Sequence, residues 1–339
     1  DGRLDVVVYW AGTNKGVVFK NLSNTSFSEA QILNDAPGGD PDDGDGASPG
    51  TIVAGASEAQ FSVSNGEVQY TIPIQVSPGG AGVTPKVSVG YSSSASYGHA
   101  GMGFSISGMS AVQRCGHSFE RDGNAVGVKG NTTDFACIDG SRLVLTSGSY
   151  WQNGSQYATE AESYTRVKYY TSTSGGYFEA ENKNGDIYRY GGTAPTRIQG
   201  GVNNGAIARW ALDSVRDRLG YGYTLDYVDG TGGRFVDAIH YTANILNNSD
   251  GYAEIKFYYG TDNYEKTYPL FGKKYASARR LSQISSRVDG QTLRNYFFYY
   301  TVNGVTGRSL MTEFYECAGD GTCLMPSKID WQKGAAPDF

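Results

Sequence analysis

The sequence predicts an all-β protein with a large multi-stranded antiparallel sheet. Three observations support this prediction. Apolar and polar residues alternate along many short segments, which is the pattern of half-buried strands. The 339 residues include 47 glycines and 26 tyrosines, and aromatic side chains favour pleated surfaces while glycines mark the turns between strands. Segments with the spacing of an amphipathic helix are hard to find.

The stretch over residues 66–114 shows the alternation most clearly. A first strand is predicted over residues 68–76, where every second residue is apolar and lies on one face. A turn rich in proline and glycine follows, and further strands are predicted over residues 85–91 and 104–109. Proline cannot donate a ladder hydrogen bond, so Pro73 predicts that the first strand lies at a sheet edge or at a bulge.

The N-terminal segments differ in character from the rest. Residues 1–33 are predicted as a first unit, in which the apolar segments 6–8 and 16–19 form a two-stranded hairpin. Residues 34–56 are predicted as a linker, and Asn34 to Gly50 within it is acidic, rich in glycine and proline, and without periodicity, so we expect it to be mobile. Residues 57–339 are predicted as the main β domain.

The linker contains four closely spaced carboxylates. Calcium prefers several carboxylate oxygens in one loop, which makes these aspartates weak candidate ligands. Their spacing does not match the EF-hand template, so a solvated acidic linker without metal is the other interpretation. The candidates are Asp40, Asp42, Asp43 and Asp45.

Charge and hydropathy exclude two classes of function. The formal net charge is −6 and no basic cluster exceeds two adjacent residues, so the electrostatic footprint of a nucleic-acid-binding protein is missing. No apolar run approaches the roughly twenty residues that cross a bilayer, and we expect no membrane span in this chain. The chain begins at Asp1 without a methionine or a signal segment, from which we expect a processed part of a larger protein.

Strands dense in tyrosine recur through the C-terminal half. Their spacing is irregular, which predicts a long meander rather than a strict solenoid. Sheet packing is the first interpretation of the tyrosines, and a sugar-binding or stacking surface is the second. The clearest such segments are residues 185–191, 222–227, 255–260 and 296–300.

The four cysteines form two local pairs in the sequence. Cys115 pairs naturally with Cys137, and Cys317 pairs with Cys323 across a short loop. An even count with local pairing indicates an oxidising compartment and predicts two disulfides. Free thiols are the second interpretation. Zinc is the third and least favoured interpretation, because neither pair has the Cys-x-x-Cys spacing of a typical zinc site.

Catalytic motifs are not found. The histidines are His99, His117 and His240, none of which lies in a zinc-protease motif, and His99 lies in a glycine-rich turn. No Gly-x-Ser-x-Gly elbow and no phosphate-binding loop is present. We therefore predict that the chain is not an enzyme, with no catalytic residue and no cofactor-binding residue.

The order of motifs over residues 66–115 carries a family resemblance. It reads Gly-Glu-x-x-Tyr-x-Ile-Pro-Ile, then Pro-Gly-Gly-x-Gly-x-x-Pro, Tyr-Ser-Ser, and Gly-x-Gly-Phe-x-Ile-Ser-Gly-Met-Ser-x-x-x-Arg-Cys. This order resembles the opening of the SpvB family, a region shared by Salmonella virulence plasmid B proteins, insecticidal toxin-complex B subunits and some Rhs-type secreted proteins. A looser likeness extends from Ser57 to Trp331.

Two shorter segments resemble repeat units of related architectures. Residues 1–8 resemble the end of an FG-GAP or VCBS repeat, which implies a short propeller-like stub before the acidic linker. Such repeats usually follow the SpvB region in toxin-complex B subunits, whereas this one precedes it. Residues 227–239 are similar to a YD repeat, the unit of Rhs and teneurin shells. These likenesses imply that the large sheet is part of a hollow β-shell.

One member of this family carries a separate ADP-ribosyltransferase domain, which uses an Arg, a Ser-Thr-Ser strand and a Glu-x-Glu pair. This chain contains Ser172-Thr173-Ser174 and Glu179-Ala180-Glu181. Only four residues separate the two motifs, which predicts one tight hairpin with no room for a nicotinamide pocket.

The resemblance implies a structural role rather than catalysis. The chain would be part of a secreted toxin-complex B or Rhs-like β-shell that encloses or helps deliver a toxic C-terminal payload. Its partners would be other toxin-complex or Rhs-type segments. The alternative is an extracellular binding or assembly module, such as an adhesin or fibre subunit, whose sheet edges pair between copies. Both interpretations place the chain outside the bacterial cell or on its surface.

Overall fold

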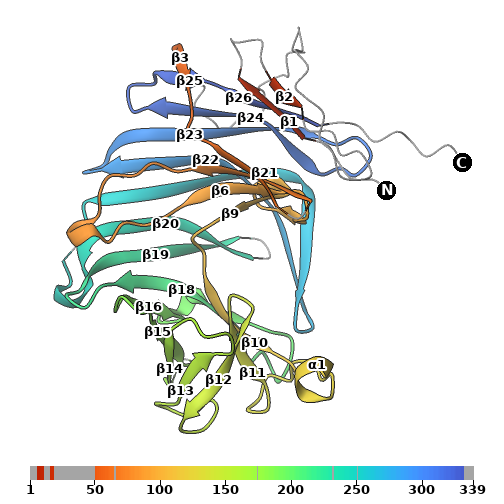
Figure 1. Ribbon diagram of the computed structural model, residues 1–339, viewed down its shortest axis with the longest axis vertical. Helices are drawn as coiled ribbons and strands as arrows, with labels where there is room; N and C mark the ends of the chain where they lie inside the picture. Colours follow the sequence, from red (N-terminus) through yellow and green to blue (C-terminus); the bar gives the residue numbers. More distant parts are fainter. Residues whose placement is uncertain are drawn as a thin grey trace, which may run out of the picture.

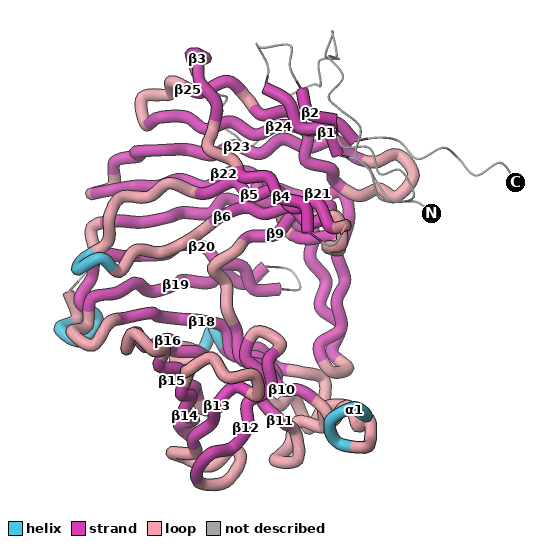
Figure 2. Tube along the Cα trace, in the orientation of Figure 1, coloured by secondary structure: helices cyan, strands magenta, loops and turns pink. Residues whose placement is uncertain are grey.

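The computed structural model describes residues 6–10, 16–18, 50–64, 66–173, 175–230, 233–249 and 251–331. Nearly all of its elements are β-strands, and most of them join one antiparallel sheet, which confirms the predicted all-β fold. Figures 1 and 2 show three parts: a compact barrel, a broad sheet above it, and a smaller sheet that crosses the face of the broad one.

Eight strands of the large sheet close into a barrel. Each strand from β10 to β15 pairs with the next along the chain, and β18 pairs with both β16 and β10, which closes the ring. The two-residue turn at Asp139 and Gly140 has positive φ at both positions, as hairpins of this type require. The strands are β10 (Ala111–Cys115), β11 (Phe135–Ile138), β12 (Ser141–Ser147), β13 (Gln156–Thr159), β14 (Arg166–Tyr170), β15 (Tyr177–Glu181), β16 (Ile187–Tyr190) and β18 (Ile207–Arg216).

Aromatic side chains fill the barrel. The rings of Trp151 and Trp210 stack with their centroids 5.7 Å apart, and Phe178 packs edge-on against Trp210 at 5.2 Å. All three side chains are buried. The interior is therefore a packed core, which accounts for part of the high aromatic content by the burial of large side chains.

The broad sheet continues from β18 as a meander. Each strand from β18 to β24 pairs with its successor, which confirms the predicted meander. The hairpin of β21 and β22 is much longer than its neighbours and reaches down toward the barrel (Figure 1). The strands that follow β18 are β19 (Tyr221–Gly230), β20 (Gly233–Asn244), β21 (Ala253–Leu270), β22 (Lys273–Val288), β23 (Gln291–Val302) and β24 (Ser309–Ala318).

A four-stranded sheet covers one face of the meander. Its order is β4 (Gln60–Ser64), β5 (Glu67–Pro73), β6 (Ser88–Ser92) and β9 (Phe104–Ile106). The alternation predicted for β5 is confirmed, because Tyr70 and Ile72 are buried while Gln69 is exposed. Tyr70 packs against Phe314 of β24, with ring centroids 6.4 Å apart. Side chains from both sheets thus form a shared core.

The prediction for Pro73 is wrong. β5 is an inner strand of the small sheet, and no bulge occurs in its pairings. Pro73 is tolerated because it is the last residue of β5 and lies beyond the end of the pairing with β4, which stops at Thr71. The missing N–H of Pro73 therefore costs no hydrogen bond to β4.

The N-terminal strands extend the same large sheet. β1 (Val6–Trp10) pairs with β2 (Gly16–Val18), as the predicted hairpin requires, and β1 also pairs with β26 (Ser327–Trp331). β3 (Ile52–Ala56), at the end of the segment predicted as a linker, pairs in parallel with β25 (Cys323–Met325). The candidate calcium ligands and residues 34–49 of the linker lie outside the described residues.

Candidate functional site: the joint at the end of the barrel

A loop between β10 and β11 occupies the end of the barrel. It spans residues 116–134 and contains the short helix α1 (Phe119–Asp122). A disulfide between Cys115 and Cys137 closes the base of this loop, and it is one of the two disulfides that the sequence predicted. Since the two strands are also paired in register, both ends of the loop are fixed.

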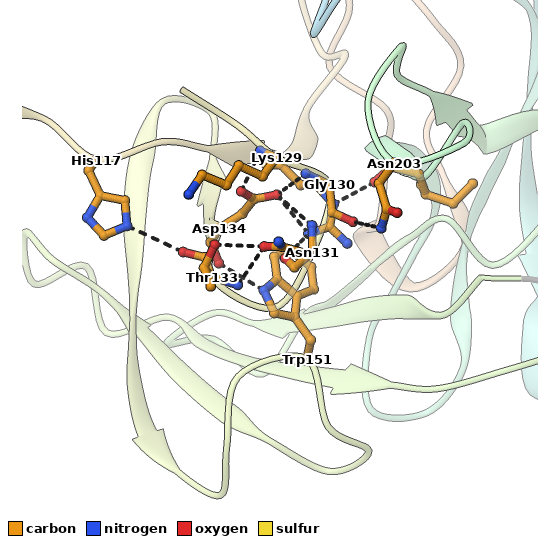
Figure 3. Close-up of polar contacts among 10 residues, drawn as sticks. His117, Lys129, Gly130, Asn131, Thr133, Asp134, Trp151 and Asn203 are labelled. Carbon is orange, nitrogen blue, oxygen red and sulfur yellow. Dashed lines mark hydrogen bonds and ion pairs between the residues drawn. The ribbon is translucent and has the colours of Figure 1, made fainter. Parts of the chain in front are cut away.

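Asp134 anchors the loop from within (Figure 3). Its carboxylate accepts hydrogen bonds from the backbone N–H groups of Lys129 at 2.7 Å, Gly130 at 2.7 Å and Asn131 at 3.2 Å. The residue is 3% exposed, and its backbone carbonyl accepts a bond from the indole nitrogen of Trp151 at 2.9 Å. The loop therefore folds around one buried carboxylate, whose charge is stabilised by convergent donors.

Arg114 balances that carboxylate. Its Nη1 lies 3.1 Å from Asp134 Oδ2, and it also donates to the carbonyl of Asn131. The guanidinium stacks over the ring of Trp151 at 4.1 Å, so one planar cation joins the loop to the aromatic core of the barrel. Burial lowers the pKa of Arg114, and the nearby Asp134 opposes that shift.

A second ion pair holds the outer part of the loop. Arg142 of β12 donates two hydrogen bonds of 2.7 Å to Asp122 at the end of α1. The hydrogen bond from Arg142 holds the pKa of Asp122 well below its usual range. His117 lies 3.9 Å from the same carboxylate and packs against the ring of Phe135. The loop is thus attached to two different barrel strands.

The anchored loop also contacts a neighbouring turn, and that turn contacts the long hairpin. Asn203 donates from Nδ2 to the carbonyl of Gly130 at 2.9 Å (Figure 3). In the same turn, the N–H of Gly201 bonds the carbonyl of Phe271 at the tip of the β21–β22 hairpin at 2.9 Å. The Tyr275 hydroxyl donates to the carbonyl of Gln199 at 2.7 Å. We name these three elements, residues 116–134, 199–205 and 270–275, the barrel joint.

The contacts of the barrel joint are suited to holding parts of the fold together. Both oxygens of Asp134 already accept hydrogen bonds, and Arg114 and Arg142 are each paired with a carboxylate. The joint can hold the barrel against the long hairpin, and its buried charges make that attachment specific in geometry.

The histidines do not form a catalytic constellation. Within the described residues, the polar neighbours of their rings are backbone carbonyls or carboxylates, not the hydroxyl or thiol of a nucleophile. His99 lies in the turn between β7 (Tyr97–Gly98) and β8 (Gly101–Met102), as predicted, and packs edge-on against Phe235. Burial, reinforced by Lys266, lowers the pKa of His99. His240 Nε2 lies within hydrogen-bond distance of Asp226 Oδ2, at 3.1 Å, in an exposed position.

The motif that resembles an ADP-ribosyltransferase lies in one hairpin. Tyr170 at the end of β14 pairs with Tyr177 at the start of β15, so Ser172 and Thr173 belong to the turn between them, as predicted. Ser174 lies outside the described residues. Glu181 forms ion pairs with Arg218 at 3.2 Å and with Arg166 at 3.6 Å. Glu181 therefore links β14 to the turn that follows β18.

Two further findings concern the described residues as a whole. Among them, no three carboxylate, histidine or cysteine side chains gather closely enough to hold a metal ion. No helix within the described part is both long and apolar enough to span a bilayer. The second predicted disulfide, between Cys317 and Cys323, links β24 to β25 at the far end of the meander.

Sequence reasoning missed the barrel joint. No local pattern links Arg114 to Asp134, because Arg114 lies on β10 and Asp134 lies at the far end of the 19-residue loop that follows this strand. One signal pointed to the region: the predicted pairing of Cys115 with Cys137 brings the two ends of the loop together. The contacts of Asn203 and Phe271 have no counterpart in the sequence pattern.

Comparisons with known proteins agree on the architecture. A crystal structure of TcdB2-TccC3 matches with a TM-score of 0.67 and 16% identity, covering 83% of this chain and 17% of that one. The Tc holotoxin pore of Photorhabdus luminescens matches with a TM-score of 0.66 and 14% identity, covering 83% and 16%. This chain therefore spans about a sixth of the length of those toxin-complex chains.

A smaller solved structure matches over almost its whole length. The N-terminal domain of the effector protein SpvB from Salmonella typhimurium strain LT2 gives a TM-score of 0.59 with 16% identity, covering 70% of this chain and 95% of that one. No curated protein sequence matches significantly. The family model described as Salmonella virulence plasmid 65kDa B protein matches residues 62–250, which is more than half of the chain. By that match, and in agreement with the fold, the chain belongs to the SpvB family.

Proposed function

We propose that the chain is a non-enzymatic wall segment of a secreted β-shell of the toxin-complex B or Rhs type. In this proposal the shell encloses or helps deliver a toxic C-terminal payload. The observation that carries the proposal is the similarity in fold to TcdB2-TccC3, which extends over 83% of this chain at a TM-score of 0.67. In this proposal the main wall is residues 57–339. The propeller-like stub of residues 1–33 and the acidic linker of residues 34–56 precede it, and they add β1, β2 and β3 to the same sheet.

The architecture suits a wall. The meander from β18 to β24 is one continuous hydrogen-bonded surface, and the small sheet doubles its thickness over one face. The barrel joint attaches the barrel to the β21–β22 hairpin at a second place besides β18. A wall that carries load needs both features, because a sheet attached along one strand alone can hinge about that strand.

Partners and compartment follow from the same proposal. Strands at the edge of a sheet offer unpaired N–H and C=O groups, which further segments of a toxin complex can extend. Two disulfides are suited to an oxidising environment outside the cell. The proposed partners are therefore other toxin-complex or Rhs-type segments, met after secretion.

The test is to determine the mass and shape of the native particle that the full-length parent protein forms, and to measure this chain in parallel. Native mass spectrometry and electron microscopy should find a large hollow particle that retains an internally cleaved C-terminal piece. Residues 57–339 should lie in its wall. A parent that forms no hollow particle would refute the proposal.

A surface assembly module is the second candidate. The described part of the chain leaves apolar side chains exposed on edge strands: Ile52 is 51% exposed on β3, and Val63 is 41% exposed on β4. Such edges can pair between identical copies. Under this candidate the chain forms polymers of one component, and their growth with concentration in light scattering distinguishes them from a closed shell.

A further inference from the structure

A cleft opens where the barrel and the meander separate. β18 belongs to both parts: residues 209–211 pair with β10, and residues 214–216 pair with β19. Barrel closure places β10 and β16 on opposite sides of β18. β16 and β19 both pair with residues 214–216 of β18, so they also lie on opposite sides of it. β10 and β19 therefore lie on the same side of β18 and separate from each other there. The cleft at this fork has a volume of about 640 Å³, within the range typical of small-molecule sites.

The floor of the cleft is apolar and aromatic. Tyr188 of β16 pairs with Val215 of β18, which pairs in turn with Tyr223 of β19, so the three side chains lie in one row on one face. Leu212 and Val215 are buried beneath the cleft, while both tyrosines are only half-buried. This row presents aromatic surface to the cleft, with a hydroxyl on each ring.

The Tyr223 hydroxyl is available for a ligand. Among the described residues it has no hydrogen-bond partner. Burial raises the pKa of Tyr223 above its ordinary value, so the hydroxyl keeps its proton at neutral pH and can both donate and accept. Lys86, at the rim of the cleft, likewise forms no ion pair within the described part of the chain. A polar ligand can satisfy both groups.

The rim is held rigidly before any ligand arrives. On one side, the N–H of Gly79 donates to Thr84 Oγ1 at 2.8 Å and closes the loop of residues 79–84, which carries Gly82 and ends two residues before Lys86. On the other side, Asn182 Oδ1 accepts from the N–H groups of Asn184 at 2.9 Å and Asp186 at 3.0 Å. Preformed rims lower the entropy cost of binding.

The charges of the cleft define the class of ligand. Asp139 and Asp186 oppose the single cation of Lys86, which disfavours an anionic ligand, and the ammonium of Lys86 disfavours a cationic one. The cleft offers carboxylates, an amide, an ammonium and phenol hydroxyls around an aromatic floor. These groups match a molecule that has many hydroxyls and an apolar C–H face. We propose that this cleft binds a neutral saccharide. The proposal does not rest on the shell function.

The test uses the whole chain and an array of neutral, acidic and basic oligosaccharides, followed by calorimetry with the best neutral one. Tyr223→Phe removes a hydroxyl that has no partner in the described structure, and Lys86→Ala removes an exposed cation. We expect a loss of affinity of roughly three- to tenfold for Tyr223→Phe and about tenfold or more for Lys86→Ala. The matched controls are Tyr252→Phe and Lys274→Ala, both at exposed positions away from the cleft.

Binding of a neutral oligosaccharide that weakens in both cleft variants, and in neither control, supports the proposal. Three outcomes overturn it. The first is that no neutral oligosaccharide binds the wild-type chain at millimolar concentration. The second is that the cleft variants bind as tightly as their controls. The third is that only acidic or basic oligosaccharides bind.

Discussion

The barrel joint predicts a large loss of stability when Asp134 is replaced by alanine. The change removes the acceptor of three backbone N–H groups and the partner of the Arg114 guanidinium. Breaking a buried ion pair by removing one partner costs about 3 to 5 kcal/mol, because the other charge is left without compensation. Water can enter from the exposed side of the loop and replace some bonds, so we expect about 3 kcal/mol of unfolding free energy to be lost.

Urea unfolding followed by intrinsic fluorescence measures this loss, since Trp151 lies against Arg114 and donates to the Asp134 carbonyl. Asp134→Asn keeps one acceptor oxygen and the side-chain volume, and we expect about half of the effect. Glu120→Gln, at an exposed position of α1, is the charge-matched control and should change stability by less than about 0.5 kcal/mol.

Limited proteolysis supplies a second readout. Without its central carboxylate the loop of residues 116–134 should open locally, so cleavage within it should become faster in Asp134→Ala than global unfolding explains. If Asp134→Ala unfolds at the same urea concentration as Glu120→Gln and its loop resists protease equally, the carboxylate is not the anchor, and the reasoning fails.

Three further predictions follow from the described contacts. Replacing Cys115 and Cys137 by serines should lower the unfolding free energy by about 3 kcal/mol, because the loop that the disulfide closes is freed, and urea unfolding measures this loss. Intact-mass analysis of the unmodified chain should find four alkylatable thiols only after reduction. Gly191→Ala should unfold at markedly lower temperature in a thermal melt, because φ is +78° and a Cβ there would lie 2.2 Å from Trp210 Cδ1. Arg142 lowers the pKa of Asp122 in the folded state, so this pair stabilises the fold at pH values above the unfolded pKa near 3.8. The stabilisation is lost as pH falls below that value. Asp122→Asn should therefore make the unfolding free energy depend less steeply on pH on the acid side.

Local patterns determined the strands of this protein and several of its turns. The alternation from Val68 onward has a period of two, so it predicted which face of β5 is buried before any partner was known. The pairing of Cys115 with Cys137 was predictable because few alternatives exist for four cysteines in two local pairs. In contrast, the position of Pro73 within its sheet was predicted wrongly, because a strand does not reveal how far its neighbour extends.

The sequence by itself determined the all-β class, the meander and the disulfides, because these depend on periodicity and on residues close together in the chain. Only the tertiary structure decided the closure of the barrel, which pairs β10 with β18 across nearly one hundred residues. Contacts between strands that are so far apart in the chain depend on many weak interactions acting together, and no short segment of the sequence indicates them. The Arg114–Asp134 anchor depends on how the loop of residues 116–134 folds back on β10, and the cleft depends on the fork at β18, so neither was visible in the sequence.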